Sequence, residues 1–269
     1  MRFQPPALDL PALLRRSGEL PAKTVPRIGV LQNYKMSTFT LKPSTTVHSI
    51  PEISQDQLES FRPFQIWHKT LSHSLSLQSQ TSHAFHTSPY HLRSITIQSC
   101  DFFGKRLGFL KFKSEVTNDQ DESLPGSVFL RGGSVAVLVV VKADEDSQEY
   151  ALLTVQARVA AGSLSFAELP AGMIDDSGTL GGAAAKEIEE ETGLQISSDD
   201  LLDMTQLALS DDHPEHENLQ QGVYPSPGAC DEFIPIFLAR KTLPTKEVEA
   251  LKGKLTGLRD EGEKITLKL

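Results

Sequence analysis

Residues 168–194 read ELPAGMIDDSGTLGGAAAKEIEEETGL. Near the end of this stretch, four glutamates fall within five positions: Glu187, Glu189, Glu190 and Glu191. Like charges at helical neighbour spacing repel each other by roughly a few tenths of a kcal/mol per pair. The crowding therefore requires an explanation, which the neighbouring residues have to supply.

The same stretch predicts a helix over about residues 180–191. Ala184 and Ile188 stand four positions apart and share one face, which we expect to pack inward. Gly193 suits the position just past a helix end, where φ is positive. The predicted helix thus has an apolar side for the core and an end that is marked by a glycine.

The carboxylates lie on another side of the predicted helix. Glu187, Glu190 and Glu191 stand at i, i+3 and i+4 and share a face, whereas Glu189 points elsewhere and is solvated. Three carboxylates on one face are stable around a divalent cation, because Mg²⁺ and Mn²⁺ are hard ions that take oxygen ligands. For an isolated E-x-x-E-E pattern, a solvated acidic face is the commoner outcome, so the flanking residues decide.

The flanking residues match a long pattern. From Gly172 to Leu194 the sequence resembles the Nudix box, G-x5-E-x7-R-E-U-x-E-E-x-G-U, in which U is a bulky aliphatic residue. Gly178 stands where the box has its first Glu, and Lys186 replaces its Arg. In the family those two side chains usually form a structural ion pair, so their joint replacement affects loop rigidity more than metal binding. The resemblance implies that the three glutamates of the shared face hold metal.

Further segments resemble the ADP-sugar diphosphatase branch of the family. In ELPAG, the resemblance makes the backbone carbonyl of Ala171 a metal ligand, and we include Glu168 among the substrate-binding residues. YPSPGACDE resembles an element that offers Glu232 as another metal or site carboxylate. GLRDEGEKI resembles an acidic loop that lies over the diphosphate and offers Glu261 and Glu263. For Glu232, Glu261 and Glu263, the alternative interpretation is an ordinary charge on the protein surface.

The resemblance implies metal-dependent hydrolysis of an ADP-sugar, such as ADP-ribose or ADP-glucose, to AMP and a sugar phosphate. Mg²⁺ is the expected cofactor, with Mn²⁺ as the alternative. A carboxylate that is not committed to metal would accept the proton of the attacking water. We choose Glu263 or Glu261 for this role, with Glu190 as the alternative. Arg158 suits a substrate phosphate, because a guanidinium fork binds it well, although a surface strand position is equally open.

Two other functions remain open. One is hydrolysis of another nucleoside-diphosphate substrate by the same box. The other is a metabolite-binding module with weak activity, which the departures at Gly178 and Lys186 suggest. His213 and His216 form an H-x-x-H pattern, but no third soft ligand stands nearby, so we favour loop solvation over zinc.

The resemblance implies a Nudix α/β/α sandwich with an N-terminal β-rich extension that helps to form a homodimer. The plant and fungal type is the most similar in pattern, over about residues 85–269. We divide the chain into a disordered tail or targeting segment (1–35), an extension with a helix and a β-hairpin (36–125) and the hydrolase domain (126–269). Members of the family continue through a closing helix. The end at Leu269 predicts that this helix is absent or that the chain is shortened.

Composition narrows the partners and the compartment. The 269 residues carry a formal net charge of -9, which disfavours nucleic acid and anionic membranes as partners. The longest apolar run, residues 134–141, is far shorter than the roughly 20 residues of a membrane span. We therefore expect a soluble protein with a small nucleotide-sugar substrate. Cys100 and Cys230 form no disulfide framework, which favours the cytoplasm. The acid-poor, Arg-containing N-terminus makes mitochondria the alternative.

Apolar patterns predict elements elsewhere in the chain. They indicate a helix over 55–71 that is broken at Pro63, strands on both sides of a turn near Gly104, and a hairpin from the segments 127–141 and 149–159. Further predictions are strands over 201–209, 232–240 and 264–269, and a short helix or turn over 245–255. The polar segment 117–126 is expected to be a loop. Strands with few helices favour a mixed α/β or α+β fold over a parallel doubly wound sheet.

Overall fold

The structure is a computed structural model, and it describes residues 36–41, 44–145, 148–174, 179–209, 217–258 and 263–269. All of them belong to one compact unit, Tyr34–Leu269. The predicted tail or targeting segment therefore lies outside the described residues. In the part of the chain that is described, no helix combines the length and the apolar character that crossing a membrane requires.

An N-terminal sheet contains five strands in the order β1-β2-β3-β4-β5. The strands are β1 (Ser37–Leu41), β2 (Thr45–Ser49), β3 (His91–Phe103), β4 (Arg106–Thr117) and β5 (Ser127–Leu130). Strands β2 and β3 pair in parallel, and the other neighbours are antiparallel. The long β3–β4 hairpin turns at Gly104, whose φ of 62° favours glycine. The predicted turn and its flanking strands are confirmed, whereas β1 and β2 were not predicted.

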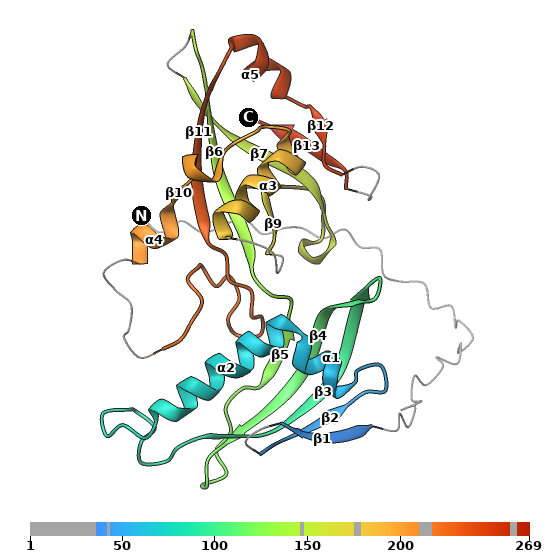
Figure 1. The fold of residues 1–269 in the computed structure, drawn as a ribbon, viewed down its shortest axis with the longest axis vertical. Coiled ribbons are helices and arrows are strands. Elements are labelled where there is room, and N and C mark those ends of the chain that lie inside the picture. Colours follow the sequence, from blue (N-terminus) through green and yellow to red (C-terminus); the bar gives the residue numbers. More distant parts are fainter. Residues whose placement is uncertain (1–35, 42–43, 146–147, 175–178, 210–216, 259–262) are drawn as a thin grey trace, which may run out of the picture. The chain divides into compact units, whose positions relative to one another are not determined.

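Two helices, α1 (Gln55–Ser60) and α2 (Arg62–Leu77), accompany this sheet (Figure 1). The predicted break is confirmed, but it lies at Phe61, where the backbone is extended. Pro63 was assigned wrongly as the breaking residue, because it occupies the first turn of α2, where a helix tolerates proline. Trp67 packs edge-on against Phe112 of β4, with ring centroids 4.7 Å apart.

A second sheet carries the glutamate-rich segment. Its main path is β10-β11-β6-β7-β13-β12, with β8 paired to β7 and β9 paired to β6. The strands are β6 (Ser134–Ala143), β7 (Glu149–Arg158), β8 (Ser163–Glu168), β9 (Ala171–Met173), β10 (Leu202–Asp203), β11 (Ile236–Leu243), β12 (Leu255–Thr256) and β13 (Ile265–Lys268). The β6–β7 hairpin is antiparallel, as predicted, while β11 lies parallel to β6.

Two helices pack on the core of this sheet. They are α3 (Leu180–Thr192) and α5 (Thr245–Leu251), and Figure 1 shows α3 lying over β7 and β9 in the view drawn. Ala184 and Ile188 of α3 are fully buried among the valines of β6, so the predicted inward face is confirmed. The helix predicted near residue 245 and the last strand are also confirmed.

The strand predicted over residues 201–209 is largely wrong. Only Leu202–Asp203 forms a strand, β10, and Met204–Leu209 forms a helix, α4. Asp203 accepts a hydrogen bond from the amide of Gln206 at 2.8 Å, which starts the helix. The Thr205 hydroxyl then accepts the amide of Ile236 at 2.8 Å and fixes α4 against β11.

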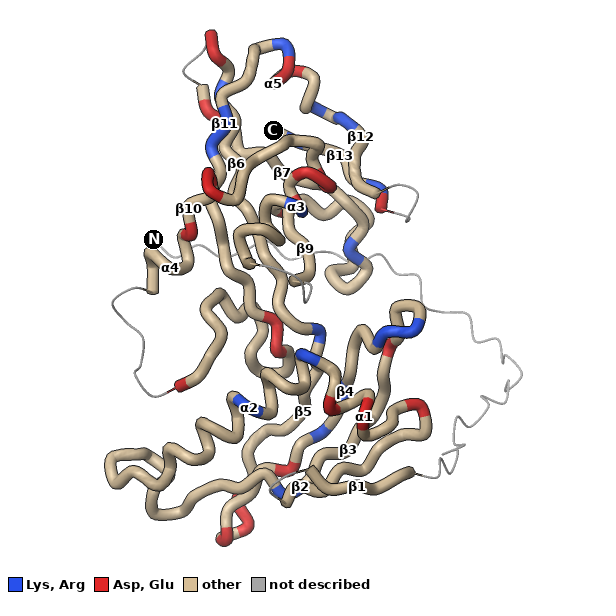
Figure 2. Tube along the Cα trace, viewed as in Figure 1, with Lys and Arg blue, Asp and Glu red and all other residues tan. Residues whose placement is uncertain are grey.

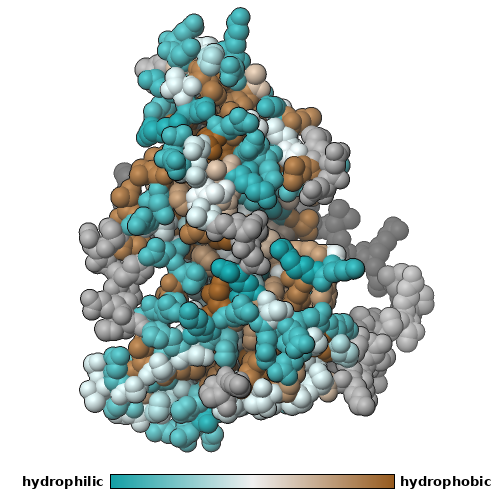
Figure 3. Space-filling view, viewed as in Figure 1, coloured by the Kyte–Doolittle hydropathy of each residue, from teal (hydrophilic) through white to brown (hydrophobic). Residues whose placement is uncertain are grey.

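The fold is a mixed α/β arrangement, as predicted from the sequence. The face drawn in Figure 3 is covered mostly by hydrophilic and intermediate residues, with hydrophobic atoms in smaller, scattered areas. Cys100 and Cys230 are free thiols. The division at residues 125 and 126 stays a prediction, and β5, which follows it, pairs with β4 of the N-terminal sheet.

Candidate active site

Strand β9 and helix α3 bring the glutamates to the second sheet. Ala171 of β9 pairs with Ala136 of β6, so the chain enters the segment at a fixed register. The Thr179 hydroxyl caps the start of α3 by accepting the Gly182 amide. Gly193 ends the helix with a φ of 74°, and its amide donates to the Glu189 carbonyl. The predicted helix and its glycine end are confirmed.

Glu191 is the most deeply buried carboxylate of the segment, with 6% of its surface exposed. Its Oε2 accepts the Ala171 amide of β9 at 3.0 Å. Its Oε1 accepts Nε2 of Gln156, from β7, at 3.3 Å. The backbone carbonyl of Glu191 accepts the Thr256 hydroxyl of β12 at 2.6 Å. One residue thus joins α3 to three strands of the sheet.

Glu187 lies directly against the first glycine of the stretch. A methyl group at Gly172 would overlap the carboxyl group of Glu187. The glycine is therefore required by the close approach of α3 to β9, and not by a positive φ. The two carboxylates one turn apart, Glu187 and Glu191, both face β9.

Arg158 and Glu168 stand next to these carboxylates. The Nε of Arg158, at the end of β7, donates to Oε1 of Glu168 of β8 at 2.7 Å. Both residues are close enough to act on the charge of Glu191. The ion pair orients the guanidinium, which is 42% exposed and thus accessible from solvent.

Burial raises the pKa of Glu191 from 4.5 to about 7. This value includes the smaller effects of the neighbours: the Ala171 amide and Arg158 lower the pKa, and repulsion by Glu187 and Glu168 raises it. A buried carboxylate with carboxylate neighbours is destabilised as an anion, and a cation would relieve that repulsion.

The remaining glutamates of α3 are more exposed. Glu190 lies 3.8 Å from the ammonium group of Lys186, one turn earlier, in a partly exposed ion pair of small energetic weight. Glu189 is exposed and accepts a hydrogen bond from Gln195, so its predicted solvation is confirmed. Glu190 is not among the groups that shift the pKa of Glu191, which distinguishes it from Glu187.

Glu232 is engaged at the start of β6. Its Oε1 forms an ion pair with the Arg131 guanidinium at 2.7 Å and accepts a hydrogen bond from the Ser134 hydroxyl at 2.9 Å. Neighbouring Asp231 accepts the backbone amides of Arg131 and Gly132. Asp231 was missed in the sequence, where only its position beside Glu232 could have drawn attention to it.

Of the two preferred proton acceptors, Glu263 and Glu261, only Glu263 is described. Its Oε2 accepts the backbone amide of Leu258 at 3.1 Å, so the side chain closes its own loop. Glu261 lies outside the described residues, as do Gly178, His213 and His216. The predicted site residues that the structure brings together are Arg158, Glu168, Ala171, Glu187 and Glu191. Glu232 and Glu263 instead bond to other groups: Glu232 to Arg131 and Ser134, and Glu263 to the Leu258 amide.

The donors around β9 have the chemistry that a hard divalent cation requires. The carboxylates of Glu187 and Glu191 are oxygen ligands, and the repulsion between them favours a bound cation. Among the described residues, no three carboxylate, imidazole or thiol groups already stand together as a complete ligand set. Water molecules and substrate phosphates commonly complete the coordination of Mg²⁺, so two protein carboxylates fit the group.

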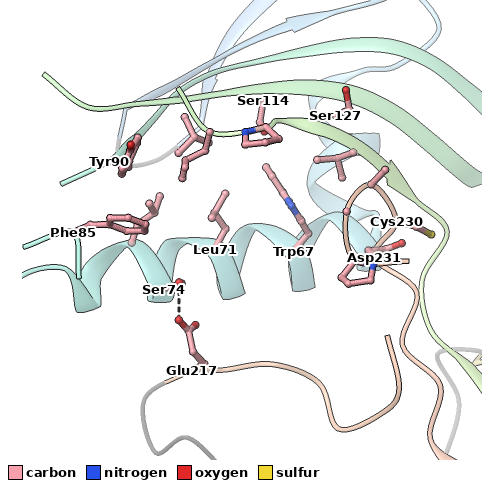
Figure 4. A pocket seen from close by; sticks show the side chains of 18 of the residues that line it. Trp67, Leu71, Ser74, Phe85, Tyr90, Ser114, Ser127, Glu217, Cys230 and Asp231 are labelled. Atoms are coloured by element: carbon pink, nitrogen blue, oxygen red, sulfur yellow. Dashed lines mark hydrogen bonds between the residues drawn. The ribbon is translucent and has the colours of Figure 1, made fainter. Parts of the chain in front are cut away.

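An apolar cavity of about 360 Å³ lies between α2 and the N-terminal sheet, away from this cluster. Trp67, Phe85 and Tyr90 contribute aromatic rings to it, and Glu217 accepts a hydrogen bond from Ser74 at 3.0 Å at its margin (Figure 4). No Lys or Arg lines it in the described part of the chain, whereas Glu217 and Asp231 do. The cavity is therefore unsuited to an anionic diphosphate.

Comparisons with known proteins agree with the geometry. Residues 133–261 match the NUDIX domain model, and the matched segment includes β9 and α3. The chain is also similar to Nudix hydrolase 14, chloroplastic, of Arabidopsis thaliana, with 42% identity over 180 residues. That alignment covers 66% of this chain and 55% of the relative. The chain thus spans about half the length of this relative.

Proposed function

We propose that the protein hydrolyses the diphosphate bond of ADP-sugars, such as ADP-ribose and ADP-glucose, with Mg²⁺. The observation that carries the proposal is the buried Glu191, held by the Ala171 amide beside Glu187, Glu168 and Arg158. This arrangement puts oxygen ligands and a cationic fork side by side, as hydrolysis of a diphosphate requires. Similarity to a Nudix hydrolase supports the reaction class.

In the proposed reaction, water attacks one phosphorus atom and the bond from that phosphorus to the bridging oxygen breaks. The products are AMP and a sugar phosphate. A divalent cation, when bound, would neutralise phosphate charge and lower the pKa of the attacking water. Glu187, Glu190 and Glu191, with the Ala171 carbonyl, would hold it, and Glu232 is a further candidate.

Other residues would act on the substrate and on the proton. Arg158 would bind a phosphate oxygen, and Glu168 would orient its guanidinium through their 2.7 Å ion pair. Glu263 or Glu261 would accept the proton of the attacking water, with Glu190 as the alternative. Glu263 would first have to leave the Leu258 amide.

The test is a substrate panel with identified products. Purified full chain is incubated with ADP-ribose, ADP-glucose, UDP-glucose, a dinucleoside diphosphate and an oxidised nucleotide, each with Mg²⁺, with Mn²⁺ and with EDTA. We expect AMP and a sugar phosphate from the ADP-sugars, and no reaction in EDTA. Turnover restricted to other members of the panel would replace the substrate class, and metal-dependent binding of ADP-ribose without turnover would favour a binding module.

The assembly and the compartment are proposals of the same kind. The N-terminal sheet would contribute to a homodimer, which light scattering of the eluted protein would detect as twice the chain mass of 29.5 kDa. We expect the cytoplasm, with mitochondria as the alternative, while the name of the relative specifies the chloroplast. Fusion of residues 1–35 to a fluorescent protein distinguishes the three.

A further inference from the structure

A second cavity, of about 590 Å³, lies where the N-terminal sheet meets β9 and α3. Its size is within the range of small-molecule pockets. Four cationic residues and no acidic residue line it in the described part of the chain; the four are Arg62, Lys105, Arg106 and Arg131. An excess of positive charge around a concave surface attracts anions in a protein whose net charge is -9.

One wall of the cavity is rigid. It consists of Gly132 and Gly133, which lie between β5 and β6. Gly132 has a φ of 82°, and its amide and that of Arg131 donate to the half-buried carboxylate of Asp231. A methyl group at Gly133 would overlap the ring of Phe233. These contacts fix the backbone of this wall.

The exposed charge of the cavity comes from the β3–β4 hairpin. Lys105 and Arg106 are exposed at its tip, where Figure 2 shows a basic segment. Within the described residues, neither side chain forms an ion pair, so both remain available to an anion. Arg131 differs, because Glu232 and Ser134 already occupy its terminal nitrogens. We therefore assign recognition to Lys105 and Arg106 and a structural part to Arg131.

Another part of the cavity lining is apolar. Phe61 and Phe233 line it and are each 9% exposed, and Met173 and Leu180 add further apolar surface. Aromatic and aliphatic side chains of this kind bind the faces of a planar base. Inorganic phosphate would use only the cationic side of such a space.

We propose that this cavity binds a nucleoside phosphate, with the phosphate at Lys105 and Arg106 and the base against Phe61 and Phe233. A nucleoside phosphate fits because it combines an anionic end with a flat apolar end. The N-terminus of α2, at Arg62, opens on the same cavity without a side-chain cap, and it adds to the positive potential.

The position of the cavity links it to the carboxylate cluster. Met173 follows Gly172 directly, and Leu180 is the first residue of α3. Glu187 lies seven residues further, about 10 Å along the helix axis. The bound nucleotide is either the AMP half of the proposed substrate, an assignment that rests on the proposed function, or a separate effector of the same chemistry.

Calorimetric titration of the full chain with AMP in EDTA tests the site without any turnover. We expect AMP to bind, and adenosine and inorganic phosphate to bind at least about tenfold more weakly, since each lacks half of the contacts. Lys105→Ala combined with Arg106→Ala should weaken AMP binding by about tenfold or more. Lys111→Ala combined with Lys113→Ala removes the same charge from β4 outside the cavity and should leave AMP binding unchanged.

Several results would overturn the proposal: no AMP binding by the wild-type chain, equal binding of AMP and phosphate, or no difference between the two double variants. If AMP binding requires Lys105 and Arg106 while no ADP-sugar is hydrolysed, the cavity stands and the proposed function fails.

Inhibition of ADP-sugar hydrolysis by AMP distinguishes the two possible ligands, which are the AMP half of the substrate and a separate effector. When the cavity holds the AMP half of the substrate, AMP inhibits ADP-sugar hydrolysis competitively and the Lys105, Arg106 variant raises KM. When it holds a separate effector, AMP changes kcat and its effect disappears in that variant. Either pattern supports the cavity as a nucleotide site, and inhibition by AMP that is identical in the variant contradicts it.

Discussion

At the scale of single residues, the contact between Gly172 and Glu187 is the most restrictive in the segment. A side chain at position 172 would displace the Glu187 carboxyl from β9. We predict that Gly172→Ala lowers kcat/KM for the proposed substrate by about 100-fold, because misplacement of a catalytic group by about 1 Å costs that much. Steady-state kinetics measure it.

Gly181→Ala is the matched control for this change. Gly181 lies in α3, and a methyl group there would make ordinary contact, at 3.8 Å, with Ser198. The Gly181→Ala variant should be as active as the wild type. Its stability should be equal or slightly higher, because alanine has a higher helix propensity than glycine. Equal activity of both alanine variants would show that the Gly172 contact has no part in catalysis.

The pKa of Glu191 predicts a dependence of stability on pH. Because burial raises the folded-state pKa from 4.5 to about 7, the native chain binds more protons than the unfolded chain between these values. The contribution of Glu191 to stability is thus present below about pH 4.5 and is lost as pH rises through about 7, by up to about 3 kcal/mol.

Glu191→Gln removes this titration. In EDTA, the stability of the variant relative to the wild type should increase between about pH 5.5 and about pH 8.5, as measured by urea unfolding. Added Mg²⁺ should reduce the difference, because a bound cation favours the ionised carboxylate. A relative stability that does not change with pH would contradict the assigned burial of Glu191.

Sequence spacing was sufficient to find some of these residues. Glu187 and Glu191 were predicted to share a face, and they both meet β9. Gln156 and Asp231 were not predicted, because their partners lie far away in the sequence. Gln156 bonds to Glu191, 35 residues further on, and Asp231 bonds to Arg131, 100 residues earlier. No local sequence pattern indicates such contacts. The burial of Glu191 was also not predictable, since it depends on strands β7, β9 and β12 together.

At the scale of elements, the N-terminal cap of α3 positions the glutamates. The Thr179 hydroxyl accepts the Gly182 amide at 3.1 Å. We predict that Thr179→Ala lowers the free energy of unfolding by about 1 kcal/mol, whereas Thr179→Ser, which keeps the acceptor, changes it little. Urea unfolding measures both, and equal losses in the two variants would exclude the cap as the cause.

Long elements with a strong pattern were predictable, and short ones were not. The β6–β7 hairpin and α3 follow from continuous apolar or helical spacing. Residues 201–209 have the composition of a strand, but the bond from the Gln206 amide to Asp203 turns most of them into helix. Strands β1 and β2 lie in a Ser- and Thr-rich segment without clear alternation, and their pairing with β3 defines them.

At the scale of the whole molecule, the described residues form one compact unit with two apolar cores. The single Trp, Trp67, packs on the core of the N-terminal sheet, and Ile188 is fully buried in the other core. We predict that Ile188→Ala, which costs about 2–5 kcal/mol, shifts the unfolding transition seen by Trp67 fluorescence. The two cores are connected by the hydrogen bonds that the Arg131 and Gly132 amides, just before β6, donate to Asp231.

Circular dichroism of the same samples is the control for that experiment. Both signals should change at one urea concentration in the wild type and shift together in the variant. A Trp67 transition that stays in place while the circular dichroism transition moves would divide the chain into two independently folding parts near residue 126.

The role of Glu191 as a metal ligand is tested by comparing the wild-type chain with Glu191→Gln in AMP release from ADP-ribose and ADP-glucose with Mg²⁺. The neutral side chain keeps the size of Glu191 and removes its charge. We predict rapid, EDTA-sensitive release of AMP by the wild type and a loss of about 100-fold or more in the variant, because the oxygen ligand next to β9 is lost. Equal rates for the two proteins would contradict the account.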